Sequence, residues 1–182
     1  MSMYKKTFSS CVVLASSLLI ISCDQSTGTP SAGSDANQSA PTITTNKSAP
    51  TVALSNSDIN VFNGDTFTLD LTASNFAASE GGGVSLSFDA SLLQVTGVTV
   101  DNTVWNFKNK DGRINNAEGT VSDILFSSYQ GVVGDAKIAT VAFQSTGTGA
   151  STITMRESSA NPFASNGQNM VVTYKTTSVY SK

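Results

Sequence analysis

A regular alternation of apolar and polar side chains begins at Phe67, and no other feature of the sequence constrains the fold as much. Phe67, Leu69 and Leu71 alternate with threonines and an aspartate. Successive side chains of a strand point to opposite faces of a sheet, so this period of two predicts a half-buried strand and not a helix. The dipeptide Asn63-Gly64 just before it is typical of a tight turn.

The rest of the chain repeats this pattern, and no segment has the period of a long amphipathic helix. Further short apolar runs, bounded by Gly, Asn, Asp and Ser, predict strands at 52–54, 59–62, 84–88, 93–100, 103–107, 120–126, 136–144, 151–155 and 170–174. Turns are expected at 110–112 and 131–135, and the glycine run 81–83 is expected to form a loop before Val84. This pattern predicts an all-β protein, a two-sheet β-sandwich of about nine strands.

The first 22 residues have the features of an export signal. Lys5 and Lys6 precede an apolar run, Cys11 to Ile21, that is too short to span a membrane as a helix. The tetrad Ile-Ile-Ser-Cys that ends at Cys23 is similar to a bacterial lipobox, in which cleavage leaves the cysteine first and acyl chains such as palmitate are attached to it. The alternative is an ordinary signal peptide with a chance cysteine. We expect a lipoprotein, with signal peptide 1–22 and lipid attachment at Cys23.

The segment that follows is predicted to be a linker, residues 23–50, and the folded domain is predicted to be residues 51–182. Ser, Thr, Ala, Gly, Asn, Gln and Pro dominate the linker, and such a composition buries too little apolar surface to fold. A flexible coil of this length reaches about 30 Å on average. Two acyl chains anchor a protein stably, so we expect a domain tethered to the bacterial cell envelope. Inner membrane, outer membrane and cell surface all remain open.

The cysteine content and net charge of the chain argue against a disulfide and against nucleic-acid binding. Cys11 lies in the signal and Cys23 is the acylation site, so no thiol is left for a disulfide. The formal net charge is −3, and removal of the signal with Lys5 and Lys6 makes it more negative. A weakly acidic surface gives no reason to expect nucleic acid as a partner. We expect a monomer that is stable through its core alone.

Three blocks carry a resemblance to a known family. They are GGGVSLSFDASLLQVTGVTV at 81–100, GVVGDAKIATVAF at 131–143 and SSANPFASNGQ at 158–168. Their order and spacing resemble the cohesin family, which carries an F/Y-D-P-x-x-L-x-V-x-G-V turn, a G-D-x-x-I-A-T/K-I-x-F strand and a late N-P-x-A-S-x-G loop. The resemblance covers roughly Thr51 to Tyr180. It implies a jelly roll and a binding module whose partner is a dockerin-like protein.

The residues give little support for catalysis or for a metal site. The chain has no histidine, and the predicted domain has no cysteine nucleophile and no G-x-S-x-G turn. Its acidic residues lie mostly beside Gly or Asn in expected turns, where a carboxylate accepts backbone hydrogen bonds. Loops at Asp101-Asn102 and 109–112 offer oxygen ligands for calcium, but the turn interpretation is favoured for both. We expect no enzyme activity and no cofactor.

Two kinds of ligand remain open. Trp105 and Phe107 are two residues apart in a predicted strand, so they share a face and either fill the core or form a ring platform for a sugar. Burial in the core is favoured for this pair, and Tyr129 is the aromatic residue most expected to be exposed. A carbohydrate-binding module that holds a polysaccharide would use Tyr129 first and Trp105 next.

Docking of a protein is the favoured alternative, on a flat polar face around Ser85 and Ser87 with Asp123 and Tyr129 nearby. The resemblance is weaker at this face than in the scaffold. The Asn and Asp that contact the dockerin in cellulosomal cohesins fall in the glycine run 81–83, and the turn proline is Ala90. Residues 127–129, Ser-Ser-Tyr, replace acidic residues of that family. We expect a lipid-anchored docking module, linked to polysaccharide breakdown, whose partner can differ from a cellulosomal dockerin.

Overall fold

The computed structural model describes residues 48–182, and every regular element in this range is a strand. The predictions for the signal peptide, Cys23 and most of the linker therefore lie outside the described residues. The strands are β1 (Thr51–Leu54), β2 (Asp58–Val61), β3 (Thr66–Ser87), β4 (Leu93–Val100), β5 (Lys110–Asn115), β6 (Thr120–Ser145), β7 (Gly149–Glu157), β8 (Ala164–Ser165), β9 (Gln168–Asn169), β10 (Thr173–Tyr174) and β11 (Thr177–Ser181). Within residues 48–182, no helix is long and apolar enough to cross a membrane.

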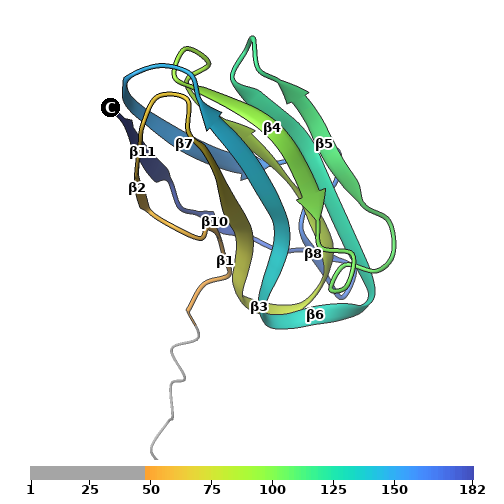
Figure 1. Ribbon diagram of the computed structural model, residues 1–182. Coiled ribbons are helices and arrows are strands. Elements are labelled where there is room, and N and C mark those ends of the chain that lie inside the picture. The colour runs from red at the N-terminus through yellow and green to blue at the C-terminus, as the bar shows by residue number, and fades with distance from the viewer. Residues whose placement is uncertain (1–47) are drawn as a thin grey trace, which may run out of the picture. The chain divides into compact units, whose positions relative to one another are not determined.

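The strands form two layers (Figure 1). One layer has the order β10-β1-β3-β6-β4 and uses the first half of β3 and the second half of β6. The other has the order β2-β11-β7-β3-β6-β5 and uses the opposite halves of β3 and β6. The predicted all-β sandwich is therefore confirmed, with β3 and β6 running from one layer into the other.

The two long strands change layer where their backbone leaves the extended region. In β3 this happens near Asn75, with φ of 61°, and Ala78, with φ of 21°, and the pairing with β6 shifts register there. In β6 it happens between Gly131 and Gly134, whose φ angles are 71° and 82°. The turn expected at 131–135 is thus a bend inside β6, visible where both ribbons curve together at the lower end of Figure 1.

Apolar side chains from both layers meet in one core. The alternation that begins at Phe67 predicts the strand correctly, since Leu69 and Leu71 are 2% and 0% exposed and Phe67 packs against the core. Large rings fill the space between the layers, and the Phe126 and Phe163 rings meet edge to face with centroids 5.6 Å apart. Residues 48–182 contain no cysteine, so this core is formed without a disulfide in the described part of the chain.

Four local predictions differ from the structure. Residues 103–107 form turns and not a strand, because Asp101 accepts hydrogen bonds from the Thr103 amide and hydroxyl and the Trp105 amide bonds back to the Asp101 carbonyl. The expected turn at 110–112 is instead part of β5, which pairs with β6. The glycine run 81–83 lies inside β3. The strand expected at 170–174 is reduced to β10.

Candidate functional site

The sheet β7-β3-β6-β5 has one face in the core and one face toward solvent. Val84 and Leu86 of β3 point inward, together with Ile124 of β6. Ser87 of β3 and Leu125 of β6 are partly exposed on the opposite face. We call this solvent side of β7-β3-β6-β5 the outer face.

Asp123 lies in the middle of the outer face and is bonded to three neighbouring side chains. Its backbone has φ of 60°, at an irregularity in the β3–β6 pairing. Its amide donates to Ser85 Oγ at 3.3 Å, and its Oδ1 accepts from Ser158 Oγ at 2.6 Å. Its Oδ2 lies 3.6 Å from the Arg113 guanidinium. The carboxylate therefore holds a turn and a strand together.

The structure changes the predicted polar face. Ser85 lies beside Asp123 as expected, but it is only 6% exposed, because it pairs in register with Arg156 and accepts the Asp123 amide. Its predicted exposure is therefore wrong. Ser87 is partly exposed at the end of β3. The polar centre of the outer face is a closed hydrogen-bond network, and this favours contacts at its rim.

The loop after β7, residues 158–163, lies over the glycine run because the glycines have no side chains. A Cβ on Gly82 would be 2.7 Å from the Phe163 ring, and one on Gly83 would be 2.7 Å from Ser158 Cβ. The Asn161 side-chain amide donates to the Gly82 carbonyl at 3.0 Å. Two blocks far apart in the sequence are thus brought together.

The segment 107–109 is bound to β6 at Ser127. The Phe107 amide donates to the Ser127 carbonyl, and Ser127 Oγ both accepts from the Lys108 amide at 3.0 Å and donates to the Lys108 carbonyl at 2.8 Å. Tyr129, two residues further along β6, is 74% exposed as predicted. Its ring lies 4.1 Å from the Phe107 ring, centroid to centroid, at 46°.

A groove of about 660 Å³ lies between the segment 107–109 and the loop after β7, and we call it the ring groove. Its lining comes from the 107–109 segment, from β5 and β6 and from the loop after β7: Phe107, Lys108, Asn109, Lys110, Leu125, Ser127, Ala160 and Asn161. Of the predicted site residues, only Tyr129 lies beside it. Sequence reasoning missed Phe107, which was expected in the core and is 45% exposed.

Trp105 is not available to a ligand. It is 0% exposed, its ring meets the Phe126 ring at 4.6 Å, and its indole Nε1 donates to the Lys137 carbonyl at 2.9 Å. The favoured burial of Trp105 is therefore confirmed, and its role as an exposed ring for a sugar is wrong.

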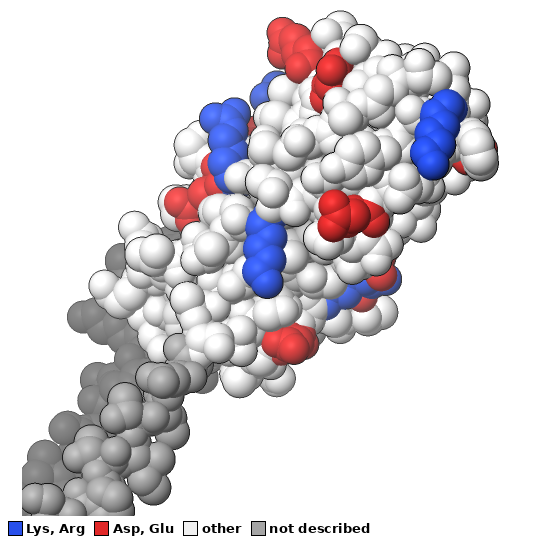
Figure 2. Space-filling model, turned by 90° about the vertical axis from the view of Figure 1, so that its left-hand side faces the viewer, with Lys and Arg blue, Asp and Glu red and all other residues white. Residues whose placement is uncertain are grey.

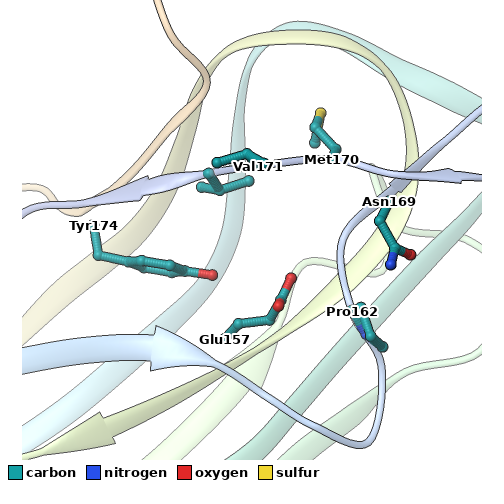
Figure 3. A pocket seen from close by; sticks show the side chains of 7 residues that line it. Glu157, Pro162, Asn169, Met170, Val171 and Tyr174 are labelled. Carbon is teal, nitrogen blue, oxygen red and sulfur yellow. The ribbon is translucent and has the colours of Figure 1, made fainter.

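A second pocket, of about 210 Å³, lies between the loop after β7 and the segment 169–174 (Figure 3). The Tyr174 hydroxyl is buried and has no hydrogen-bond partner among the described residues. In Figure 3 it points toward the Glu157 carboxylate, whose Oε1 accepts from the Phe163 amide at 2.9 Å. Burial, with a smaller effect of the Glu157 charge, raises the pKa of Tyr174 above its ordinary value. The pocket has room for a small polar group such as water.

The loops considered for calcium use their oxygen atoms internally. Asp101 Oδ1 accepts from Thr103 Oγ1 at 2.6 Å, and this hydrogen bond is the main reason why the pKa of Asp101 is lowered. Asp111 Oδ1 accepts from the Val100 amide at 2.8 Å. Within residues 48–182, no group of three or more Asp, Glu, His or Cys side chains is placed to hold a metal ion.

Charged side chains are sparse on the surface of the domain. Figure 2 shows a few basic and acidic residues scattered over a largely uncharged surface, some of them beside a residue of opposite charge. The two ion pairs among residues 48–182 are Arg113–Asp123 and Lys137–Asp70. Neither pair includes a cationic residue of the ring groove.

We compared the sequence and the fold with those of known proteins. No family model matches the sequence, and no curated protein sequence matches it. Solved structures do match the fold. The cohesin of a type I cohesin–dockerin complex from Clostridium thermocellum (Coh-OlpC-Doc435) aligns with a TM-score of 0.62 at 17% identity, over 74% of this chain and 94% of that one.

Two more solved structures agree. A second type I cohesin–dockerin complex from Clostridium thermocellum (Coh-OlpA-Doc918) gives a TM-score of 0.60 at 13% identity, over 74% of this chain and 100% of that one. A non-cellulosomal cohesin from the archaeon Archaeoglobus fulgidus gives 0.58 at 14% identity, over 74% and 92%. The chain has the fold of a cohesin domain, and cohesins are jelly-roll β-sandwiches.

Proposed function

We propose that this protein is a non-catalytic, lipid-anchored docking module that holds a dockerin-like partner protein at the bacterial cell envelope, in a system linked to polysaccharide breakdown. The observation that carries the proposal is the match to cohesins, several of which were solved in complexes with dockerins. Function does not follow from fold alone, so the docking surface has to be argued from this chain.

The outer face of β7-β3-β6-β5 is the proposed docking surface. Thr51, where the domain begins, pairs with Ser74 and Thr173 in the other layer. A tether that ends at Thr51 therefore joins the chain at the layer opposite the outer face. Most stable interfaces bury about 800 Å² on each partner, and a flat sheet face with an exposed rim suits a contact of that size.

The docking surface is testable by site-specific photo-crosslinking in the source cells. A photoreactive amino acid at Ser87, on the outer face, is expected to capture one discrete protein that carries a small dockerin-like module. The matched control is the same amino acid at Thr99, an exposed residue of β4 in the other layer. The docking proposal fails if Ser87 captures nothing, or if both positions capture the same set of proteins.

The anchor requires its own test, because Cys23 lies outside the described residues. The wild-type protein is expected to incorporate radiolabelled palmitate and to sediment with membranes. Cys23→Ser is expected to lose the label and to leave the protein released or unprocessed. If the wild-type protein incorporated no label, the predicted lipid attachment would be wrong, but the docking proposal would not be affected.

Direct binding of a polysaccharide is the second candidate function, and the exposure of Tyr129 is the observation that favours it. Aromatic rings at protein surfaces stack on the apolar faces of ligands, and Tyr129 is 74% exposed. A glycan array probed with the whole chain tests this candidate. Binding that Tyr129→Ala abolishes in a folded protein would support it, and an array without signal would exclude it for the glycans printed.

A further inference from the structure

We propose that the ring groove receives an acidic segment of the partner protein that carries one large apolar side chain. In this arrangement the apolar side chain enters the groove beside Leu125, and the ammonium groups of Lys108 and Lys110 pair with the carboxylates around it. The inference rests on the proposed docking function and names the chemistry of the partner.

The rim of the groove is preorganised. Three hydrogen bonds between the 107–109 segment and Ser127, and a further one from the Ser127 amide to the Asn109 side chain at 3.1 Å, hold the segment on β6. The Phe107 and Tyr129 rings brace each other at 4.1 Å. Exposed aromatic side chains that are already held in place lose little entropy on binding, and such residues dominate interface energetics.

The floor of the groove is apolar. Leu125 points out of β6, and Ala160 contributes from the loop after β7. The polar groups around them, Ser127 and Asn161, already have partners, because Ser127 Oγ bonds to Lys108 and the Asn161 amide bonds to Gly82. A groove of about 660 Å³ lies in the usual range for a pocket that buries a compact group. An apolar side chain fits it better than a second charge.

The charge at the rim is positive although the whole chain has a net charge of −3. Lys108 and Lys110 both line the groove, and neither forms an ion pair within the described part of the chain. Asp111 follows Lys110 in β5, but it forms no ion pair with Lys108 or Lys110, and its Oδ1 accepts from the Val100 amide. Two free ammonium groups beside an apolar floor select against basic segments and favour acidic ones.

The geometry of the rings argues against a sugar as the occupant. Sugar platforms need free ring faces, but Phe107 has Tyr129 on one side and the Lys108 ammonium 5.4 Å from its centroid. Tyr129 is the more exposed ring of the two, but it lies against Phe107 and does not form a row of rings with it. A protein side chain can contact ring edges, so it is the occupant that this arrangement favours.

The test is selection of random 12-residue peptides displayed on phage against the immobilised full-length protein. The expected consensus has a Trp, Phe or Leu flanked by at least two Asp or Glu residues. A synthetic peptide of the consensus is then titrated at low and at high salt, and its affinity is expected to fall with salt because exposed charge pairs are screened.

Matched variants locate the binding. Lys108→Glu with Lys110→Glu and, separately, Phe107→Ala are each expected to weaken peptide binding at least tenfold. Lys108→Arg with Lys110→Arg is expected to retain it. Lys175→Glu, an exposed lysine outside the groove, and Phe62→Ala, an exposed ring that is 67% accessible outside the groove, are expected to change it less than twofold. A melting curve for each variant verifies that it is folded.

Several results would overturn the inference. One is a peptide consensus that is basic or uncharged. Another is a peptide affinity that does not change when Lys108 and Lys110 are both replaced by Glu. A third is a glycan that displaces the peptide and whose own binding depends on Phe107 and Tyr129. Failure here is distinguishable from failure of the docking function. A partner captured at Ser87 but not at Thr99, without any acidic selection, would leave docking in place and remove only the ring groove as the anchor point.

Discussion

The Ser158 hydroxyl donates a hydrogen bond of 2.6 Å to the Asp123 carboxylate and so joins the loop after β7 to the middle of β6. The same loop supplies Ala160 and Asn161 to the ring groove. The shape of the groove therefore depends on a contact between residues that are far apart in the sequence. Asp123, predicted as a partner contact, acts here as a residue that positions the site.

Two substitutions of Asp123 test whether it stabilises the domain through its hydrogen bond to Ser158 and its backbone conformation. Asp123→Ala removes the acceptor of Ser158 and leaves a non-glycine residue at φ of 60°, so we expect a loss of about 2 kcal/mol in the free energy of unfolding. Asp123→Asn keeps an acceptor and a residue type that tolerates this backbone, so we expect a loss of about 1 kcal/mol or less. Urea denaturation of both variants measures the difference, and equal losses would contradict this assignment.

Gly82 in the glycine run and Gly97 in β4 offer a matched pair of substitutions. Gly82→Ala places a methyl group 2.7 Å from the Phe163 ring, which lies in the core, so we expect it to cost about 1–3 kcal/mol. Gly97→Ala in β4 meets nothing within 4 Å, so we expect a change within about 0.5 kcal/mol. Thermal melting of the two variants compares them directly. A Gly82→Ala protein as stable as Gly97→Ala would mean that the loop does not lie on β3.

Local pattern was enough to predict most of the sandwich. The alternation at Phe67 and the run 93–100 define their strands correctly, because a half-buried strand has its own signature in sequence. Trp105 and Phe107 show where such reasoning stops. A spacing of two puts two side chains on one face only within a strand, and residues 103–107 do not form one. The turn at Asp101 therefore sends Trp105 inward and Phe107 outward.

The ring groove could not be predicted for a different reason. Its walls come from the 107–109 segment and from the loop after β7, and these meet only because the glycine run lets the loop lie against β3. The sequence alone predicts a loop at 81–83, and it does not show which segment lies against these glycines. Ser85 shows the same limit of sequence-based prediction. Alternation along the strand predicts that Ser85 points outward, but its burial depends on its neighbours Arg156 and Asp123, which the sequence pattern does not show.

Trp105 is expected to contribute to stability and not to binding. Trp105→Ala removes a fully buried ring and should cost about 3–5 kcal/mol. Trp105→Phe keeps most of the apolar contact with Phe126 but leaves the Lys137 carbonyl without its donor, so we expect a smaller loss. Chemical denaturation measures both. A Trp105→Ala protein of unchanged stability would contradict the burial of the ring.

Acid should reduce the stabilisation that Asp101 provides. The hydrogen bond from the Thr103 hydroxyl holds the pKa of Asp101 below its ordinary value in the folded state. A group whose folded pKa is lowered stabilises the protein above the unfolded pKa and loses that effect as the pH falls through the folded one. The melting temperature of Thr103→Val is therefore expected to lie below that of the wild type at pH 6. The gap should narrow below about pH 4, and a gap that is constant with pH would contradict the linkage.

Ala90 stands where the cohesin pattern has proline, and the structure explains why proline should fit. Asp89 begins the turn, since its carbonyl accepts from the Leu92 amide at 3.1 Å and its carboxylate accepts from Ser91. Ala90 is the second residue of that turn, a position that favours proline, and its amide donates no hydrogen bond within residues 48–182. Ala90→Pro is expected to raise the free energy of unfolding by about 0.4–1 kcal/mol, because it restricts the unfolded chain. Ser91→Pro, which removes the amide that donates to Asp89 at 2.9 Å, is the matched control and should destabilise the domain in the same denaturation experiment. A destabilised Ala90→Pro protein would show that the turn departs from this geometry.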